Sequence, residues 1–174
     1  MKPTNIDSGK VTKIEVDEAD KRKVFGKKPA EPAVRSAGKS VFLIGLLGSG
    51  RRAVGRTLAA RLKLGFIEIS DRTGLDQALS GERVVASVDQ GLVADEEAAA
   101  LLRNKGVVFY LMPGVQAVAE ARGLVADEEC KRRIFAEIDE WETRFMRVLH
   151  FLLPGGISVE ATAADAADKL YMVK

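Results

Sequence analysis

The chain has 174 residues, enough for one ordinary domain, and its 27 Lys and Arg against 25 Asp and Glu leave a net charge of +2. This balance argues against nucleic acid or a membrane surface as a partner on bulk charge. The single cysteine, Cys130, excludes an internal disulfide. Because the sequence also shows no apolar run long enough to span a membrane and no secretory signal, we expect a cytoplasmic protein.

Residues 1–39 are predicted to form a disordered, charged tail that folding does not require. They hold ten Lys and Arg against six acidic residues, and apolar residues are sparse. A short alternating stretch at 11–16 would form a strand if a partner offered a sheet edge. The basic cluster at 21–28 is typical of a solvated surface, with docking of a protein, an RNA or an anionic surface as the alternative.

Residues 40–174 are predicted to alternate between strands and helices. Strands are expected at 40–45, 65–69, 83–88, 106–112 and 149–153, because these runs are short and apolar. Helices are expected at 50–64, 95–105, 114–122 and 127–148, and Thr162 with Asp165 resembles a capping box that opens a last helix. Residues 71–82 are predicted to be a turn-rich connection. This order predicts an α/β fold, a three-layer P-loop NTPase-like domain with a five-stranded parallel sheet and helices on both faces.

A glycine-rich segment, Gly45–Arg52, lies between the first strand and the first helix, where the phosphate-loop pattern G-x-x-x-x-G-K-[ST] is expected. Its glycines let the backbone curl so that N–H groups converge on an anion at the helix N-terminus. The lysine position holds Arg51, which would still pair with phosphate oxygens, and the Ser/Thr position holds Arg52, which cannot coordinate Mg²⁺. The predicted phosphate-binding residues are Gly45, Gly48, Ser49, Gly50, Arg51 and Arg52. A plain tight turn is the alternative.

Three carboxylates are candidate metal ligands. Asp89 follows an apolar run, although a loop carboxylate or a helix-opening residue is the more frequent reason for such an Asp. Glu68 and Asp71 are weaker candidates. His150 is interpreted as a strand residue, Trp141 as part of the core stripe of a helix, and Cys130 as an ordinary exposed thiol.

Residues 40–174 resemble the shikimate kinase family. The match runs from Gly45 to Leu62, continues at 66–70, and is most specific at 54–59 (VGRTLA). The resemblance implies a P-loop kinase fold that binds ATP. It also implies that Arg122 falls near the arginine that lies against the adenine in the family.

The sequence departs from the family pattern at several functional positions. The family Asp that helps hold Mg²⁺ aligns with Glu68, the shikimate-binding Asp with Ser70, and the Gly-Gly-Gly motif with residues 88–90. No lid arginine motif follows Arg122. The helical shikimate-binding segment of the family is reduced to residues 71–82.

We therefore expect a degenerate phosphate loop in a protein without catalytic activity. It would bind phosphate, ATP or ADP without requiring Mg²⁺, or would act as a protein-interaction module. One alternative is an active ATP-dependent small-molecule kinase that uses Glu68 or Asp89 for Mg²⁺. Another is a structural partner protein without a ligand, which docks on another protein through the basic tail, residues 1–39.

Overall fold

The computed structural model describes residues 38–173. Residues 1–37 and 174 lie outside the described range, so the predicted tail, with its strand and its basic cluster, stays a prediction.

Deletion of residues 1–36 should leave a chain that still unfolds cooperatively, because residues 1–36 have too little apolar content to contribute a core. A thermal melt of this variant against the full chain measures the effect. A deletion that extends through Leu43 is the matched control, since it removes most of a fully buried central strand and should abolish the transition. Loss of cooperativity in the shorter deletion would contradict the prediction.

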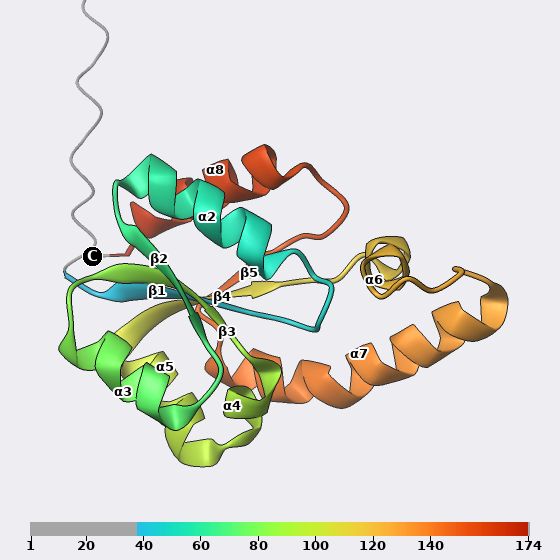
Figure 1. Cartoon of the computed structure of the whole chain (residues 1–174), viewed down its shortest axis with the longest axis horizontal. Coiled ribbons are helices and arrows are strands. Elements are labelled where there is room, and N and C mark those ends of the chain that lie inside the picture. Colours follow the sequence, from blue (N-terminus) through green and yellow to red (C-terminus); the bar gives the residue numbers. More distant parts are fainter. Residues whose placement is uncertain (1–37, 174) are drawn as a thin grey trace, which may run out of the picture. The chain divides into compact units, whose positions relative to one another are not determined.

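Five parallel strands form the sheet in the order β2-β3-β1-β4-β5 (Figure 1). The strands are β1 (Ser40–Ile44), β2 (Gly65–Ile69), β3 (Val84–Val88), β4 (Gly106–Leu111) and β5 (Phe151–Leu153). The predicted α/β fold with a five-stranded parallel sheet is confirmed. Both β1 and β4 are buried along their whole length, as expected for central strands covered on both faces.

Helices cover both faces of the sheet (Figure 1). One face carries α2 (Arg51–Leu62) and α8 (Val159–Leu170). The other carries α3 (Arg72–Ser80), α4 (Gln90–Ala94), α5 (Glu96–Lys105) and α7 (Glu128–Val148), while α6 (Val115–Ala121) follows β4. Successive side chains of β1 point to opposite faces of the sheet and so contribute to two separate cores. Val41 and Leu43 pack toward α2 and α8, and Phe42 and Ile44 pack toward the opposite layer.

The structure corrects the predicted connection at 71–82, which contains helix α3 rather than turns alone. Asp71 caps this helix by accepting a hydrogen bond from the Gly74 N–H at 2.8 Å, and Leu75 and Ala78 are its buried residues. Two buried residues in nine give too weak a period to identify a helix from the sequence. Helix α4 was also not predicted, because its five residues include too few buried ones to show a helical period.

The start of the last helix was also predicted wrongly. Helix α8 begins at Val159, and Ser158 is its cap, since the Ser158 hydroxyl accepts from the Ala161 N–H at 3.1 Å. Thr162 lies inside the first turn and donates its hydroxyl to the Ser158 carbonyl at 2.9 Å. Ser and Thr four residues apart both suit a cap position, and the sequence pattern favoured the wrong one.

Candidate functional site

The phosphate-loop segment lies at the carboxyl end of β1, between β3 and β4 in the sheet. The strands that follow β1 in the chain lie on both sides of it: β2 and β3 on one side, β4 and β5 on the other. In parallel sheets, ligand crevices open at the carboxyl ends of the strands where the strand order reverses in this way. A cavity of about 520 Å³ lies there, lined by the continuous stretch from Leu47 to Ala53 together with Ala121 and Arg122. The sequence-predicted loop residues Gly48 to Arg52 are therefore brought together around one space.

The curl of the loop depends on glycine at two positions. Gly48 has φ 93°, and a Cβ atom there would lie 3.2 Å from both the Ala121 Cβ and the Val118 Cα of α6. At Gly45, φ is 153°, and a Cβ would lie 2.9 Å from the Leu111 carbonyl oxygen. Side chains at these positions would force the loop away from α6 and β4.

The N-terminus of α2 offers unpaired hydrogen-bond donors to the cavity. The cap residue, Gly50, has no side chain, and the first turn holds no acidic residue. The first N–H groups of a helix have no acceptor within the helix and lie at the positive end of its dipole. Beside them the Ser49 hydroxyl oxygen is buried without a hydrogen-bond partner among the described residues. An uncapped helix start next to an orphaned hydroxyl fits a phosphate group.

Arg51 is directed beneath the loop. Its Nη1 donates a hydrogen bond to the Val88 carbonyl at the end of β3. Burial lowers the pKa of Arg51, and the nearby Asp89 carboxylate opposes this effect. Because a guanidinium stays protonated in proteins, Arg51 places a partly buried positive charge at the base of the loop.

Arg52 has a different partner. Its Nε lies 2.8 Å from a carboxylate oxygen of Glu68 on β2, and Arg56 approaches the same carboxylate at 3.7 Å. The guanidinium groups of the two loop arginines thus meet different strands. Arg52 is ion-paired with Glu68 of β2, whereas Arg51 is hydrogen-bonded to the neutral Val88 carbonyl of β3.

The candidate metal ligands do not form one site. Asp71 caps α3, Asp89 caps α4 by accepting from the Gly91 N–H at 2.8 Å, and Glu68 is paired with Arg52. Within residues 38–173, no group of three or more His, Cys, Asp and Glu side chains is placed to hold a metal ion. The three candidate carboxylates are therefore engaged by three different groups rather than gathered around one point.

Arg122, predicted near a nucleotide base, follows α6 and lines the loop cavity. Its guanidinium edge donates to the Leu47 carbonyl in the loop and forms a bidentate ion pair with Glu137 of α7. Hydrogen bonding to Glu137 raises the pKa of Arg122. The side chain therefore bridges the loop and α7.

No family model matches the chain. Among curated proteins, the shikimate kinase of Nitratidesulfovibrio vulgaris is 35% identical over 105 residues, which cover 45% of this chain and 60% of that protein. The shikimate kinase of Nitrobacter winogradskyi is 29% identical over 111 residues, which cover 63% of this chain and 49% of that protein. A solved structure, shikimate kinase from Acinetobacter baumannii in complex with shikimate, matches with a TM-score of 0.62 at 18% identity, over 82% of this chain and 96% of that one.

The chain is similar in sequence to shikimate kinases over part of its length, and it has the P-loop kinase fold of their solved structures. The resemblance expected from residues 45–62 is thereby confirmed. The chain spans about half to three fifths of the length of these two curated relatives.

The sequence interpretation of this shikimate kinase-like chain missed two groups of residues at the site. The Gln90 side chain accepts a hydrogen bond from the Leu47 N–H at 3.1 Å and so holds the loop from the α4 side. Residues 154–157 and the loop line a second cavity of about 200 Å³, and a Cβ on Gly155 would lie only 2.3 Å from the Met112 carbonyl. The Pro-Gly-Gly run directly after the last strand was the signal for this segment, because carboxyl ends of parallel strands meet at one edge.

Other singled-out residues in the shikimate kinase-like domain have structural roles. His150 lies just before β5 rather than in the strand predicted for it; its Nδ1 accepts from the Val108 N–H at 3.1 Å, and burial lowers the pKa of His150. Trp141 stacks on Phe145, in agreement with its predicted packing role. Cys130 is half-buried rather than exposed, because it packs beside Ile134 at the start of α7. None of the helices between residues 38 and 173 has the length and apolar character that a membrane span requires.

Proposed function

We propose that this shikimate kinase-like chain binds inorganic phosphate, or the phosphate groups of ATP or ADP, at the Gly45–Arg52 loop without catalysing phosphoryl transfer. The uncapped start of α2 carries the proposal, together with the orphaned Ser49 hydroxyl beside it. An anion there would accept hydrogen bonds from backbone N–H groups that have no acceptor within the helix. The Arg51 guanidinium, which lines the loop cavity and donates to the neutral Val88 carbonyl, adds a positive charge.

Two features around the loop support the proposed loss of catalysis. Phosphoryl transfer needs a metal ion and an acceptor held in line with the transferred group. At the position of the family's metal-binding hydroxyl, Arg52 forms an ion pair with Glu68, the aligned metal-binding carboxylate. Glu68 is thus engaged by Arg52, and a metal ion that took Glu68 would leave the exposed Arg52 guanidinium beside it as an unpaired like charge.

An active ATP-dependent small-molecule kinase is the second candidate. The names of the curated relatives favour it, since both are shikimate kinases. For Mg²⁺ to bind through Glu68, the carboxylate would have to leave Arg52, and for Asp89 to bind it, the cap of α4 would have to open. Each rearrangement costs interactions that the present geometry makes, so we rank this candidate second.

Binding of ADP should be as tight in EDTA as in millimolar Mg²⁺, because the charge on Arg51 replaces part of what the metal supplies in an intact phosphate loop. Calorimetric titration in the two buffers measures this. Affinity should fall steeply as salt is added, since the attraction is electrostatic and screened by ions. Arg51→Met should weaken binding by about tenfold or more, as expected when a charged hydrogen-bond donor is lost.

Arg61→Met is the matched control, because Arg61 lies in the last turn of the same helix, away from the cavity. It should bind ADP like the unmodified chain. ADP binding that requires Mg²⁺ would refute the proposal and favour the kinase. No binding in either buffer would favour a structural partner protein whose loop is only a turn.

Two wider expectations belong to this proposal. A protein partner that docks through residues 1–39 is motivated by the basic cluster at 21–28, which lies outside the described residues. A cytoplasmic location is motivated by the single cysteine.

A further inference from the structure

We propose that Arg122 is a positioning residue for anion binding: held by Glu137, it fixes the crown of the phosphate loop, defined here as Leu47 and Gly48. This inference rests on the proposed function, because it assigns a role in the anion binding proposed for the same loop. It concerns contacts between segments that lie far apart in the sequence, since Arg122 and Leu47 are 75 residues apart.

The hydrogen bonds of Arg122 use most of its donors. Nε and Nη2 donate to the Leu47 carbonyl at 3.2 and 3.1 Å, and Nη1 and Nη2 donate to the two Glu137 carboxylate oxygens at 2.7 and 3.0 Å. A guanidinium has five N–H groups, and these four bonds leave one. The fork geometry that serves two acceptors at once is specific to arginine, since the lysine ammonium is a point charge.

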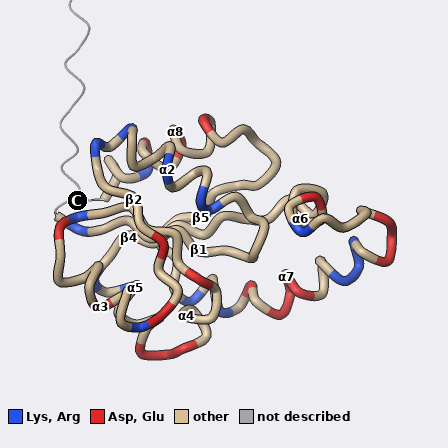
Figure 2. Tube along the Cα trace, in the orientation of Figure 1, with Lys and Arg blue, Asp and Glu red and all other residues tan. Residues whose placement is uncertain are grey.

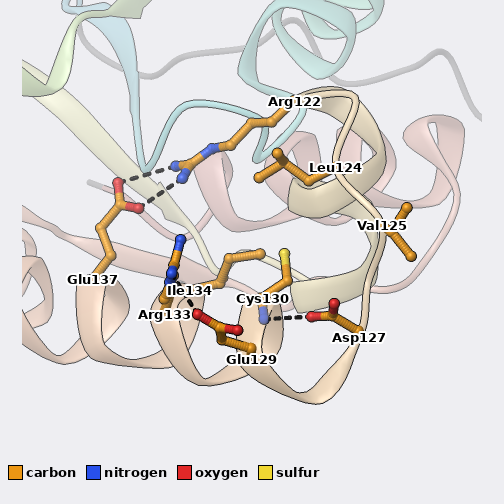
Figure 3. Close-up of a pocket in the computed structure, with 9 residues that line it drawn as sticks. All are labelled: Arg122, Leu124, Val125, Asp127, Glu129, Cys130, Arg133, Ile134 and Glu137. Atoms are coloured by element: carbon orange, nitrogen blue, oxygen red, sulfur yellow. Dashed lines mark hydrogen bonds and ion pairs between the residues drawn. The ribbon is translucent and has the colours of Figure 1, made fainter.

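Figure 3 shows how Glu137 holds the guanidinium. Arg122 extends from the end of α6 toward α7, where its Nη atoms meet both carboxylate oxygens of Glu137. The two side chains retain only 21% and 28% of their exposure, so water competes weakly with the pair. The ion pair also forms one wall of a cavity of about 510 Å³ between residues 122–127 and α7.

The crown is thus held from two sides. Gln90 accepts from the Leu47 N–H, and Arg122 donates to the Leu47 carbonyl. In a trans peptide the carbonyl and the following N–H point in opposite directions, so the bond to the Leu47 carbonyl also sets the direction of the Gly48 N–H. Gly48 has φ 93°, and glycine adopts many backbone conformations at little cost. The backbone alone would therefore not hold the peptide group between Leu47 and Gly48 in one orientation.

Charge alone does not account for this arrangement. Glu137 neutralises Arg122, so the pair adds little net positive field to the loop cavity. An arginine that served only to attract an anion would gain nothing from a bidentate carboxylate partner. A positioning role uses the partner, because Glu137 fixes the guanidinium where it meets the Leu47 carbonyl.

Arg122→Lys and Arg122→Met distinguish positioning of the crown from attraction of the anion by charge. Lysine keeps the charge but cannot hold Leu47 and Glu137 together, so both variants should weaken binding of inorganic phosphate by about tenfold, as loss of one or two hydrogen bonds predicts. The salt dependence should not change in Arg122→Lys. Amide hydrogen exchange at Gly48, measured without ligand, should become faster in both variants.

Arg133→Lys is the control, because Arg133 lines the same cavity and pairs with Glu129 rather than with the loop (Figure 3). It should change neither affinity nor exchange. Full affinity and unchanged Gly48 exchange in Arg122→Lys would overturn the inference in favour of a charge effect. Absence of phosphate binding in the unmodified chain would instead refute the proposed function, and Gly48 exchange would still decide whether Arg122 holds the crown.

Discussion

Shikimate should not be phosphorylated at a detectable rate by the unmodified chain, and Arg51→Lys with Arg52→Ser should not restore the activity. Loss of a single preorganised group that stabilises a transition state costs about 10²–10³ in rate. Here the position aligned with the family's shikimate-binding Asp holds Ser70, and the aligned Gly-Gly-Gly positions include Asp89 and Gln90. The double substitution changes only the phosphate loop and leaves these acceptor-side positions as they are.

The position of Asp89 and Gln90 in the structure strengthens this expectation. Asp89 caps α4, and Gln90 binds the Leu47 N–H in the loop crown, so both are committed to structural contacts. A coupled assay of ADP release, with and without shikimate, tests the rate. An active shikimate kinase in the same assay is the positive control. Shikimate-dependent turnover by the unmodified chain would contradict the prediction and revive the kinase candidate.

Phe145→Ala should lower the free energy of unfolding by about 3–5 kcal/mol, the usual cost of removing a buried aromatic ring. Phe145 on α7 is fully buried and stacks between two other rings, with centroids 4.8 Å from Tyr110 of β4 and 5.7 Å from Trp141. The substitution removes both contacts and leaves a cavity beneath the helix. Urea unfolding followed by circular dichroism measures the loss.

Phe135→Ala on the same helix is the matched control. Its side chain is 55% exposed, so the substitution should change stability by less than about 0.5 kcal/mol. Groups of acidic and basic residues follow one another along α7 (Figure 2), and its buried residues are Ile134, Phe145 and Val148. Exposed ion pairs contribute little to stability, so these few buried residues hold the helix. Equal losses in the two variants would show that Phe145 does not anchor α7. Because Glu137 lies on α7, the anchor also supports the contact with Arg122.

The sequence by itself determined the strands, the long helices and the place of the phosphate loop. The apolar runs at 40–44 and 106–111 are continuous because both faces of these strands are buried, and such runs need no knowledge of the rest of the chain. The loop was located by glycines between a strand and a helix, which is a local pattern. Helices with few buried residues gave weak local patterns, and for this reason α3 and α4 were missed.

Only the tertiary structure decided what the charged residues at the site do. Arg51 meets the Val88 carbonyl 37 residues away, Arg52 meets Glu68 on the neighbouring β2, and Arg122 meets Leu47 and Glu137. A long guanidinium side chain reaches many acceptors, and its choice depends on which strands are adjacent in the order β2-β3-β1-β4-β5. The sequence therefore identified these residues as a group, whereas the packing of the sheet and of α7 assigned each one its partner.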